Sequence, residues 1–61
     1  MYLLYTYIEN VKVYLVNYNQ HTGFNYDILR ERATRFSEAE AYNLVDLAKR
    51  LRAKNIYLEK Y

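Results

Sequence analysis

The chain has 61 residues, no cysteine and a formal net charge of +2, from nine Lys and Arg against seven Asp and Glu. This length allows one domain, covering residues 1–61, and a hydrophobic content of 52% argues against disorder. The absence of cysteine excludes disulfides and thiolate metal sites and fits a cytoplasmic location. The small net charge excludes a polyanion binder that relies on bulk charge. The apolar run from Met1 to Ile8 lacks a basic leader and is too short for a membrane helix, so we expect no membrane contact.

Two runs of aromatic, aliphatic and β-branched residues open the chain, from Tyr2 to Ile8 and from Val11 to Tyr18. Glu9 and Asn10 separate them, and asparagine tolerates the positive φ that a two-residue turn requires, so the pattern predicts a β-hairpin. Antiparallel pairing outward from this turn places alternate residues on one aliphatic face. That face is expected to hold Leu4, Thr6, Ile8, Val11, Val13 and Leu15.

The remaining hairpin residues share the opposite face, which is rich in tyrosine. Tyrosine offers a rigid, half-apolar contact surface at low entropic cost and is enriched where protein partners bind. It is also a good strand former, so tyrosine pairs that only stabilise the sheet are an equally weighted alternative. The candidate partner-binding residues are Tyr5, Tyr7, Lys12, Tyr14 and Tyr18.

The residues after the hairpin give weaker signals for further strands. A polar segment with the only glycine, residues 17–23, predicts a loop, and Phe24 to Asp27 predicts the start of a third strand. Residues 28–36 show no clean period, and for them we expect a turn followed by a short strand from Ala33 to Phe36. Ile56 to Lys60 alternates as a last strand, with one side formed by Tyr57, Glu59 and Tyr61.

A helix is expected to begin at Ser37, because Ser37 and Glu40 have the spacing of a capping box. Its apolar stripe should pack on the aliphatic sheet face, and Asn55 is expected as a left-handed C-cap. The stripe consists of Ala41, Leu44, Val45, Ala48 and Leu51. The predicted fold class is therefore α+β: a small antiparallel sheet, built from the β-hairpin plus one or two further strands, with one helix packed on one face.

No catalytic or metal-binding pattern is present in the sequence. His21 is the sole histidine and has no second ligand at a helical or hairpin spacing. Ser37 is occupied as a helix cap, and Gly23 alone cannot form a phosphate-binding loop. We therefore expect a non-enzymatic protein with no cofactor and no metal site.

The basic residues allow two interpretations. Together with an aromatic sheet face they could hold a single-stranded nucleic acid by phosphate contacts and base stacking. Acidic residues are interleaved with them, however, which favours an ordinary solvated surface, so nucleic-acid binding is the alternative to a protein partner. The residues concerned are Arg30, Arg32, Arg35, Lys49, Arg50, Arg52 and Lys54.

The segment from Ala33 to Ala41, Ala-Thr-Arg-Phe-Ser-Glu-Ala-Glu-Ala, is followed by an amphipathic helix and a short closing strand. With the hairpin before it, this arrangement resembles the small uncharacterised accessory proteins of phages of Gram-positive bacteria. The resemblance implies an inhibitor or adaptor that acts in the host cytoplasm by stoichiometric binding to a host enzyme or defence component, and it carries over no site residues. Because so short a chain has no disulfide or metal to stabilise it, we also expect self-association.

Overall fold

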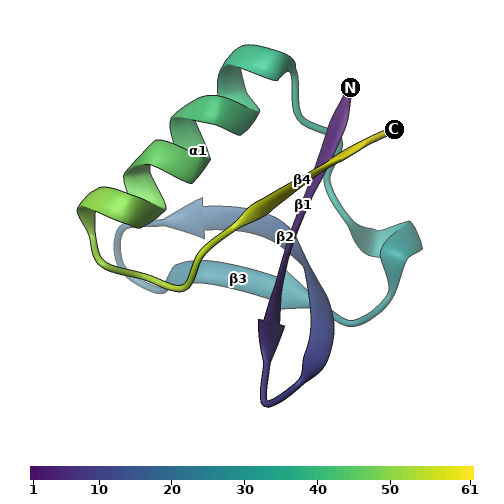
Figure 1. Cartoon of the computed structure of the whole chain (residues 1–61), viewed down its shortest axis with the longest axis horizontal. Helices are drawn as coiled ribbons and strands as arrows, with labels where there is room; N and C mark the ends of the chain where they lie inside the picture. Colours follow the sequence, from purple (N-terminus) through teal and green to yellow (C-terminus); the bar gives the residue numbers. More distant parts are fainter.

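The computed structural model describes residues 1–61 and contains one sheet and one helix. The sheet has four antiparallel strands in the order β3-β2-β1-β4, and the helix covers one of its faces (Figure 1). This confirms the predicted α+β class. The elements in chain order are β1 (Tyr2–Ile8), β2 (Val11–Asn19), β3 (Gly23–Asp27), the 3₁₀ turn η1 (Arg30–Arg32), α1 (Glu38–Arg50) and β4 (Tyr57–Lys60).

The hairpin of β1 and β2 forms as the sequence predicts. Glu9 and Asn10 both have positive φ, 50° and 69°, which matches the twist of the two strands they connect. The register runs from Ile8 opposite Val11 to Tyr5 opposite Tyr14. The first strand thus pairs with β2 on one side and with β4 on the other, so β1 lies in the middle of the sheet.

A β-bulge interrupts the alternation of β2 between Leu15 and Asn17. Because of the extra residue, each side chain after the bulge points to the sheet face opposite to the one that strict alternation predicts. Tyr18 consequently lies opposite Phe24, with ring centroids 4.7 Å apart, and Phe24 packs against the core beneath the helix. The prediction that Tyr18 shares a face with Tyr5 is therefore wrong. The strand also continues to Asn19, so the expected loop shrinks to residues 20–22.

The helix α1 begins as predicted. The Glu40 backbone N–H donates to Ser37 Oγ at 3.2 Å, and the Ser37 N–H donates to Glu40 Oε1 at 3.2 Å, which completes the capping box.

The end of the helix differs from the prediction. Arg52, with φ 57°, is the left-handed residue in place of Asn55, and the Ala53 N–H donates to the Ala48 carbonyl at 2.8 Å in a Schellman arrangement. Because the chain turns away here, Leu51 is 53% exposed and does not join the core stripe. Asn55 instead accepts a 2.7 Å hydrogen bond at its carbonyl from the buried Thr6 hydroxyl, which fastens the helix-to-strand connection to β1.

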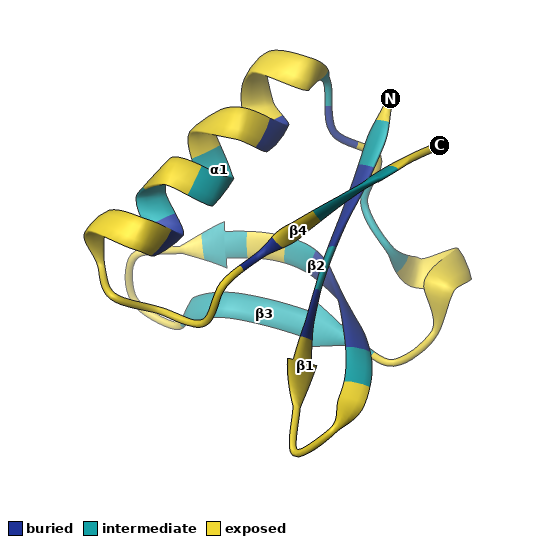
Figure 2. Cartoon of the chain, viewed as in Figure 1, coloured by how far each residue is buried: buried dark blue, intermediate teal, exposed yellow.

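The core lies between the sheet and α1, and it is small. Buried residues are confined to this interlayer and to a few central strand positions, ten of 61 in all (Figure 2). The main cluster comprises Leu4, Leu15, Phe36, Ala41, Ala48 and Ile56.

At 13 residues and with several charged side chains, α1 is neither long nor apolar enough to span a membrane.

Residues 28–36 do not form the expected strand. They make the 3₁₀ turn η1 and then a single bridge between Phe36 and Tyr2. Thr34 explains the path of this segment, because its hydroxyl and its backbone N–H donate to the carbonyls of Val16 and Leu15 at 2.5 and 3.4 Å, respectively. These carbonyls lie at the bulge, so the irregularity in β2 provides the attachment point for the segment that follows η1.

Candidate functional site

The sheet face opposite α1, called the outer face below, carries most of the candidate residues. Register places Tyr5 between Tyr14 of β2 and Tyr57 of β4, and it places Lys12 opposite Tyr7. Tyr5, Tyr7, Lys12 and Tyr14 therefore lie together as predicted, and the bulge removes only Tyr18 from the group.

Three tyrosines of the outer face pack ring against ring, and we call Tyr5, Tyr7 and Tyr57 the tyrosine cluster. The Tyr5 ring centroid lies 5.5 Å from that of Tyr57 and 6.0 Å from that of Tyr7, the latter pair edge to face at 90°. Tyr7 and Tyr57 are separated by 6.4 Å and are 49% and 45% exposed. Contact with one another thus orders the three rings, while about half of the Tyr7 and Tyr57 side chains remains exposed.

Tyr57 was not among the predicted site residues. The alternation of Ile56 to Lys60 assigns Tyr57 to one side of a strand but does not say which strand lies beside it. Only the pairing of β4 with β1 brings Tyr57 next to Tyr5, across 52 positions of sequence, and no local pattern reports that pairing.

Lys12 lies over Tyr5 of the cluster and over the neighbouring Tyr14. Its Nζ is 4.2 Å from the Tyr5 ring centroid, 5.3 Å from that of Tyr14 and 3.3 Å from Glu59 Oε1. The neighbouring Tyr14 hydroxyl has the largest effect and raises the pKa of Lys12 above its usual 10.5; desolvation, which ranks second, opposes the shift, and Glu59 adds to it. The ammonium therefore remains charged and is held by cation–π and ionic contacts at once.

Glu59 lies between two cations. Its Oε2 accepts from Arg30 at 2.9 Å, while Oε1 accepts from Lys12. Arg30 first, and then Lys12, lower the pKa of the Glu59 carboxyl below its usual 4.5. A third ion pair joins Arg32 to Asp27 at 3.7 Å, so three cations near the cluster share two carboxylates.

Tyr14 has a supporting position. It is only 7% exposed, because η1 packs against β2, and its ring centroid lies 6.3 Å from that of Tyr5. Tyr14 therefore supports Tyr5 and Lys12 and exposes little surface of its own.

The chain shows no grouping of side chains that is typical of a metal site. No three His, Cys, Asp or Glu side chains group closely enough to hold a metal ion. His21 is exposed in the connection between β2 and β3, where its backbone N–H donates to Asn19 Oδ1 at 2.7 Å. Every buried side-chain nitrogen and oxygen has a hydrogen-bond partner.

Comparison with known proteins gives no match: no protein-family model, no curated protein and no solved structure is significantly similar to this chain.

Proposed function

We propose that the chain is a non-enzymatic module that binds a protein partner through its outer face, with the tyrosine cluster at the centre of the contact. The observation that carries this proposal is the ordered and half-exposed state of Tyr7 and Tyr57. Protein interfaces concentrate their binding energy in a few aromatic anchors surrounded by polar side chains. The ion pairs of Glu59 and Asp27 would supply such a surround.

The same geometry favours a protein over a single-stranded nucleic acid. Base stacking needs open ring faces, and the edge-to-face contact of Tyr5 with Tyr7 covers a face of one of these two rings. Phosphate contacts along a nucleic-acid backbone need several free cations, whereas Lys12 and Arg30 both pair with Glu59 and together leave one positive charge uncompensated. Nucleic-acid binding is therefore the alternative, which the oligonucleotide titration described below tests.

The more specific role comes from the resemblance to phage accessory proteins and rests on it alone. On that basis the partner would be a host enzyme or defence component, inhibited or recruited in the host cytoplasm by stoichiometric binding. A surface of aromatic anchors without catalytic groups fits this mode of action, because occupancy of the partner and not turnover produces the effect.

We also propose self-association. Only ten of 61 residues are buried, and the exposed apolar side chains include Val11 and Ile8 beside the hairpin turn. A core of this size is marginal for a monomer, and burial against a second copy would stabilise it. Sedimentation equilibrium at micromolar concentration should give a mass above that of one chain, and a single-chain mass throughout would contradict the proposal.

Capture of partners from a nuclease-treated lysate of a Gram-positive bacterium tests the proposed function. The double variant Tyr7→Ser with Tyr57→Ser should lose the proteins that the native chain retains. Tyr42→Ser is the matched control, because Tyr42 is 52% exposed but lies on α1. Equal capture by the double variant and by the native chain would overturn the assignment of the outer face.

A labelled single-stranded oligonucleotide, titrated at low and at physiological salt, tests the alternative. The proposal predicts weak binding that is unchanged by the two serine substitutions. Tight binding that falls steeply with salt and is lost in the double variant would establish nucleic acid as the partner, because released counterions produce that dependence.

A further inference from the structure

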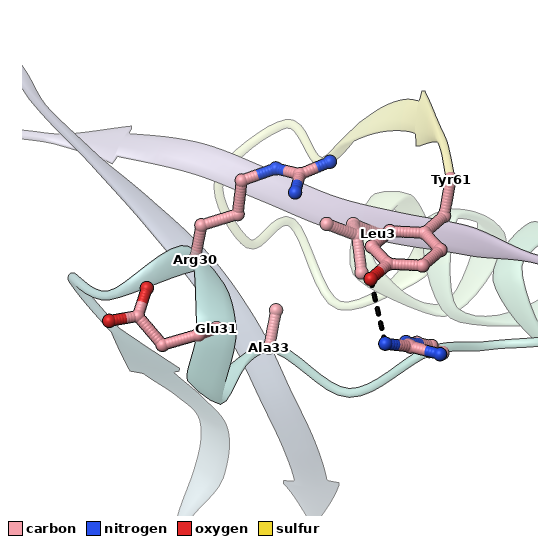
Figure 3. Close-up of a pocket in the computed structure, with 6 residues that line it drawn as sticks. Leu3, Arg30, Glu31, Ala33 and Tyr61 are labelled. Atoms are coloured by element: carbon pink, nitrogen blue, oxygen red, sulfur yellow. Dashed lines mark hydrogen bonds between the residues drawn. The ribbon is translucent and has the colours of Figure 1, made fainter.

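A pocket of about 220 Å³ opens on the outer face beside the tyrosine cluster. Its floor includes Leu3, which is buried and precedes Tyr5 by two positions on the same face of β1. Figure 3 shows the Arg30 and Tyr61 side chains extending toward each other across Leu3. The complete lining is Leu3, Arg30, Glu31, Ala33, Arg35 and Tyr61.

Arg35 is the cation of this pocket that has no carboxylate partner. It is absent from all four ion pairs of the chain, which use Lys12, Arg30, Arg32 and Arg50. Its guanidinium carbon lies 4.1 Å from the Tyr61 ring centroid, and one of its nitrogens donates to the Tyr61 hydroxyl at 2.7 Å. A guanidinium has five N–H donors in a fixed plane, so most of those of Arg35 remain free.

The guanidinium groups of Arg30 and Arg35 both lie over the Tyr61 ring. The guanidinium carbon of Arg30 lies 5.3 Å from the same ring, on which Arg35 also rests. Arg30 uses its Nε and one terminal nitrogen on Glu59, which leaves the other terminal nitrogen for a further acceptor. The Glu31 carboxylate points away from Tyr61 in Figure 3, so the end of the pocket near Tyr61 is cationic.

The balance of charge and apolar surface indicates which anion would fit. Among the lining side chains, Arg30 and Arg35 contribute two positive charges and Glu31 one negative charge, so these side chains sum to +1, which one monoanion would neutralise. A dianionic phosphate would leave an excess negative charge near Glu31 and Glu59. Ala33 and the Tyr61 ring provide apolar contact for a short hydrocarbon stem above the buried Leu3.

We propose that this pocket binds the carboxylate of an acidic side chain of the protein partner, with Arg35 as the principal donor. The inference rests on the proposed function, since the pocket and the tyrosine cluster share the outer face. Leu3 and Tyr5 are two residues apart, about 7 Å along the strand. One partner segment could therefore place an apolar side chain on the cluster and an acidic one in the pocket, and bidentate Arg–carboxylate geometry would fix its register.

Titration of the isolated chain with propionate tests the pocket without the partner. The arginine Nε–Hε signals of Arg30 and Arg35 should shift saturably in the NMR spectrum, and the neutral isostere propionamide should have no effect. Inorganic phosphate at matched ionic strength should bind at least threefold more weakly than propionate. Shifts that stay linear to the highest concentration, or phosphate binding as tight as that of propionate, would overturn the assignment.

Variants localise the effect. Arg35→Gln should weaken propionate binding at least tenfold, and Arg35→Lys should give an intermediate loss because it keeps the charge but not the planar fork. Arg50→Gln is the matched control, since Arg50 is an exposed arginine of α1 paired with Asp46. Equal affinities in Arg35→Gln and Arg50→Gln would contradict the proposal.

The two proposals can fail separately. Absence of propionate binding with capture still dependent on Tyr7 and Tyr57 would discard the pocket alone. Propionate binding with capture indifferent to those tyrosines would discard the proposed contact surface and leave an anion site without its assigned partner.

Discussion

Leu4 and Tyr5 are neighbours in β1, but Leu4 is fully buried beneath α1 whereas Tyr5 lies in the partly exposed tyrosine cluster. The inner face of the sheet, toward α1, packs aliphatic side chains and Phe36 against two alanines of the helix. The outer face instead holds aromatic rings and ion pairs, with η1 across one part of it. The comparison indicates that the inner face stabilises the fold, and we propose that the outer face binds a partner.

The largest effect should come from the inner face. Leu15→Ala removes a fully buried side chain from the main cluster and should lower the free energy of unfolding by about 2 to 5 kcal/mol, through lost apolar burial and the cavity left behind. Urea denaturation followed by circular dichroism measures the change.

Leu51→Ala is the control for this comparison, because it makes the same chemical change at a side chain that is 53% exposed. Its substitution should change stability by no more than about 0.5 kcal/mol. If Leu51→Ala and Leu15→Ala cost the same, the inner face would not be the source of stability that the structure indicates.

A smaller effect is expected at the helix cap, which positions α1 on the inner face. Ser37→Ala should destabilise by about 1 kcal/mol, because it leaves the Glu40 backbone N–H without its acceptor. Ser37→Asp should restore most of the loss, since aspartate is also a good N-cap. An unchanged denaturation midpoint in Ser37→Ala would mean that the capping box contributes nothing to stability.

The inner face was largely predictable from the sequence, because its signals are local. The hairpin turn depends on Glu9 and Asn10, and the helix start depends on Ser37 and Glu40, which are three residues apart. The expected end of the helix was wrong because Arg52 adopts positive φ where asparagine was favoured. That choice depends on how the following chain reaches β4.

The outer face was only partly predictable. Alternation placed Tyr5, Tyr7 and Lys12 together, but the bulge that diverts Tyr18 has no signal in side-chain pattern. The conformation of residues 28–36 was not predicted for a related reason. The Thr34 hydroxyl, just after η1, donates to the Val16 carbonyl of β2, and these two residues are 18 positions apart in the sequence. Long-range pairing, and not local propensity, determines this side of the molecule.

The smallest expected effect concerns the ion pairs of the outer face. The folded pKa of Glu59 is lowered from its usual 4.5, so its contribution to stability is present above that unfolded value and is lost as pH falls through the folded value. Glu59→Gln should therefore lower the urea midpoint more at pH 6 than at pH 3. The difference should be small, because Lys12 and Arg30 are partly exposed.

Unfolding at a series of pH values, for Glu59→Gln beside the native chain, provides the measurement. The control is Asp46→Asn, whose carboxylate pairs with Arg50 on the exposed side of α1. A constant difference between Glu59→Gln and the native chain from pH 6 to pH 3 would contradict the role assigned to this carboxylate.

The most direct test of the division between the two faces is photo-cross-linking from single positions. Tyr57 or, as the control on α1, Tyr42 is replaced by p-benzoylphenylalanine, and the two side chains start from similar exposure, 45% and 52%. On irradiation in a lysate of a Gram-positive bacterium, position 57 should form a cross-link to one defined protein, and position 42 should not. Equal cross-linking from both positions, or cross-links from position 57 to nucleic acid or to a second copy alone, would contradict the proposal that the outer face binds a protein partner.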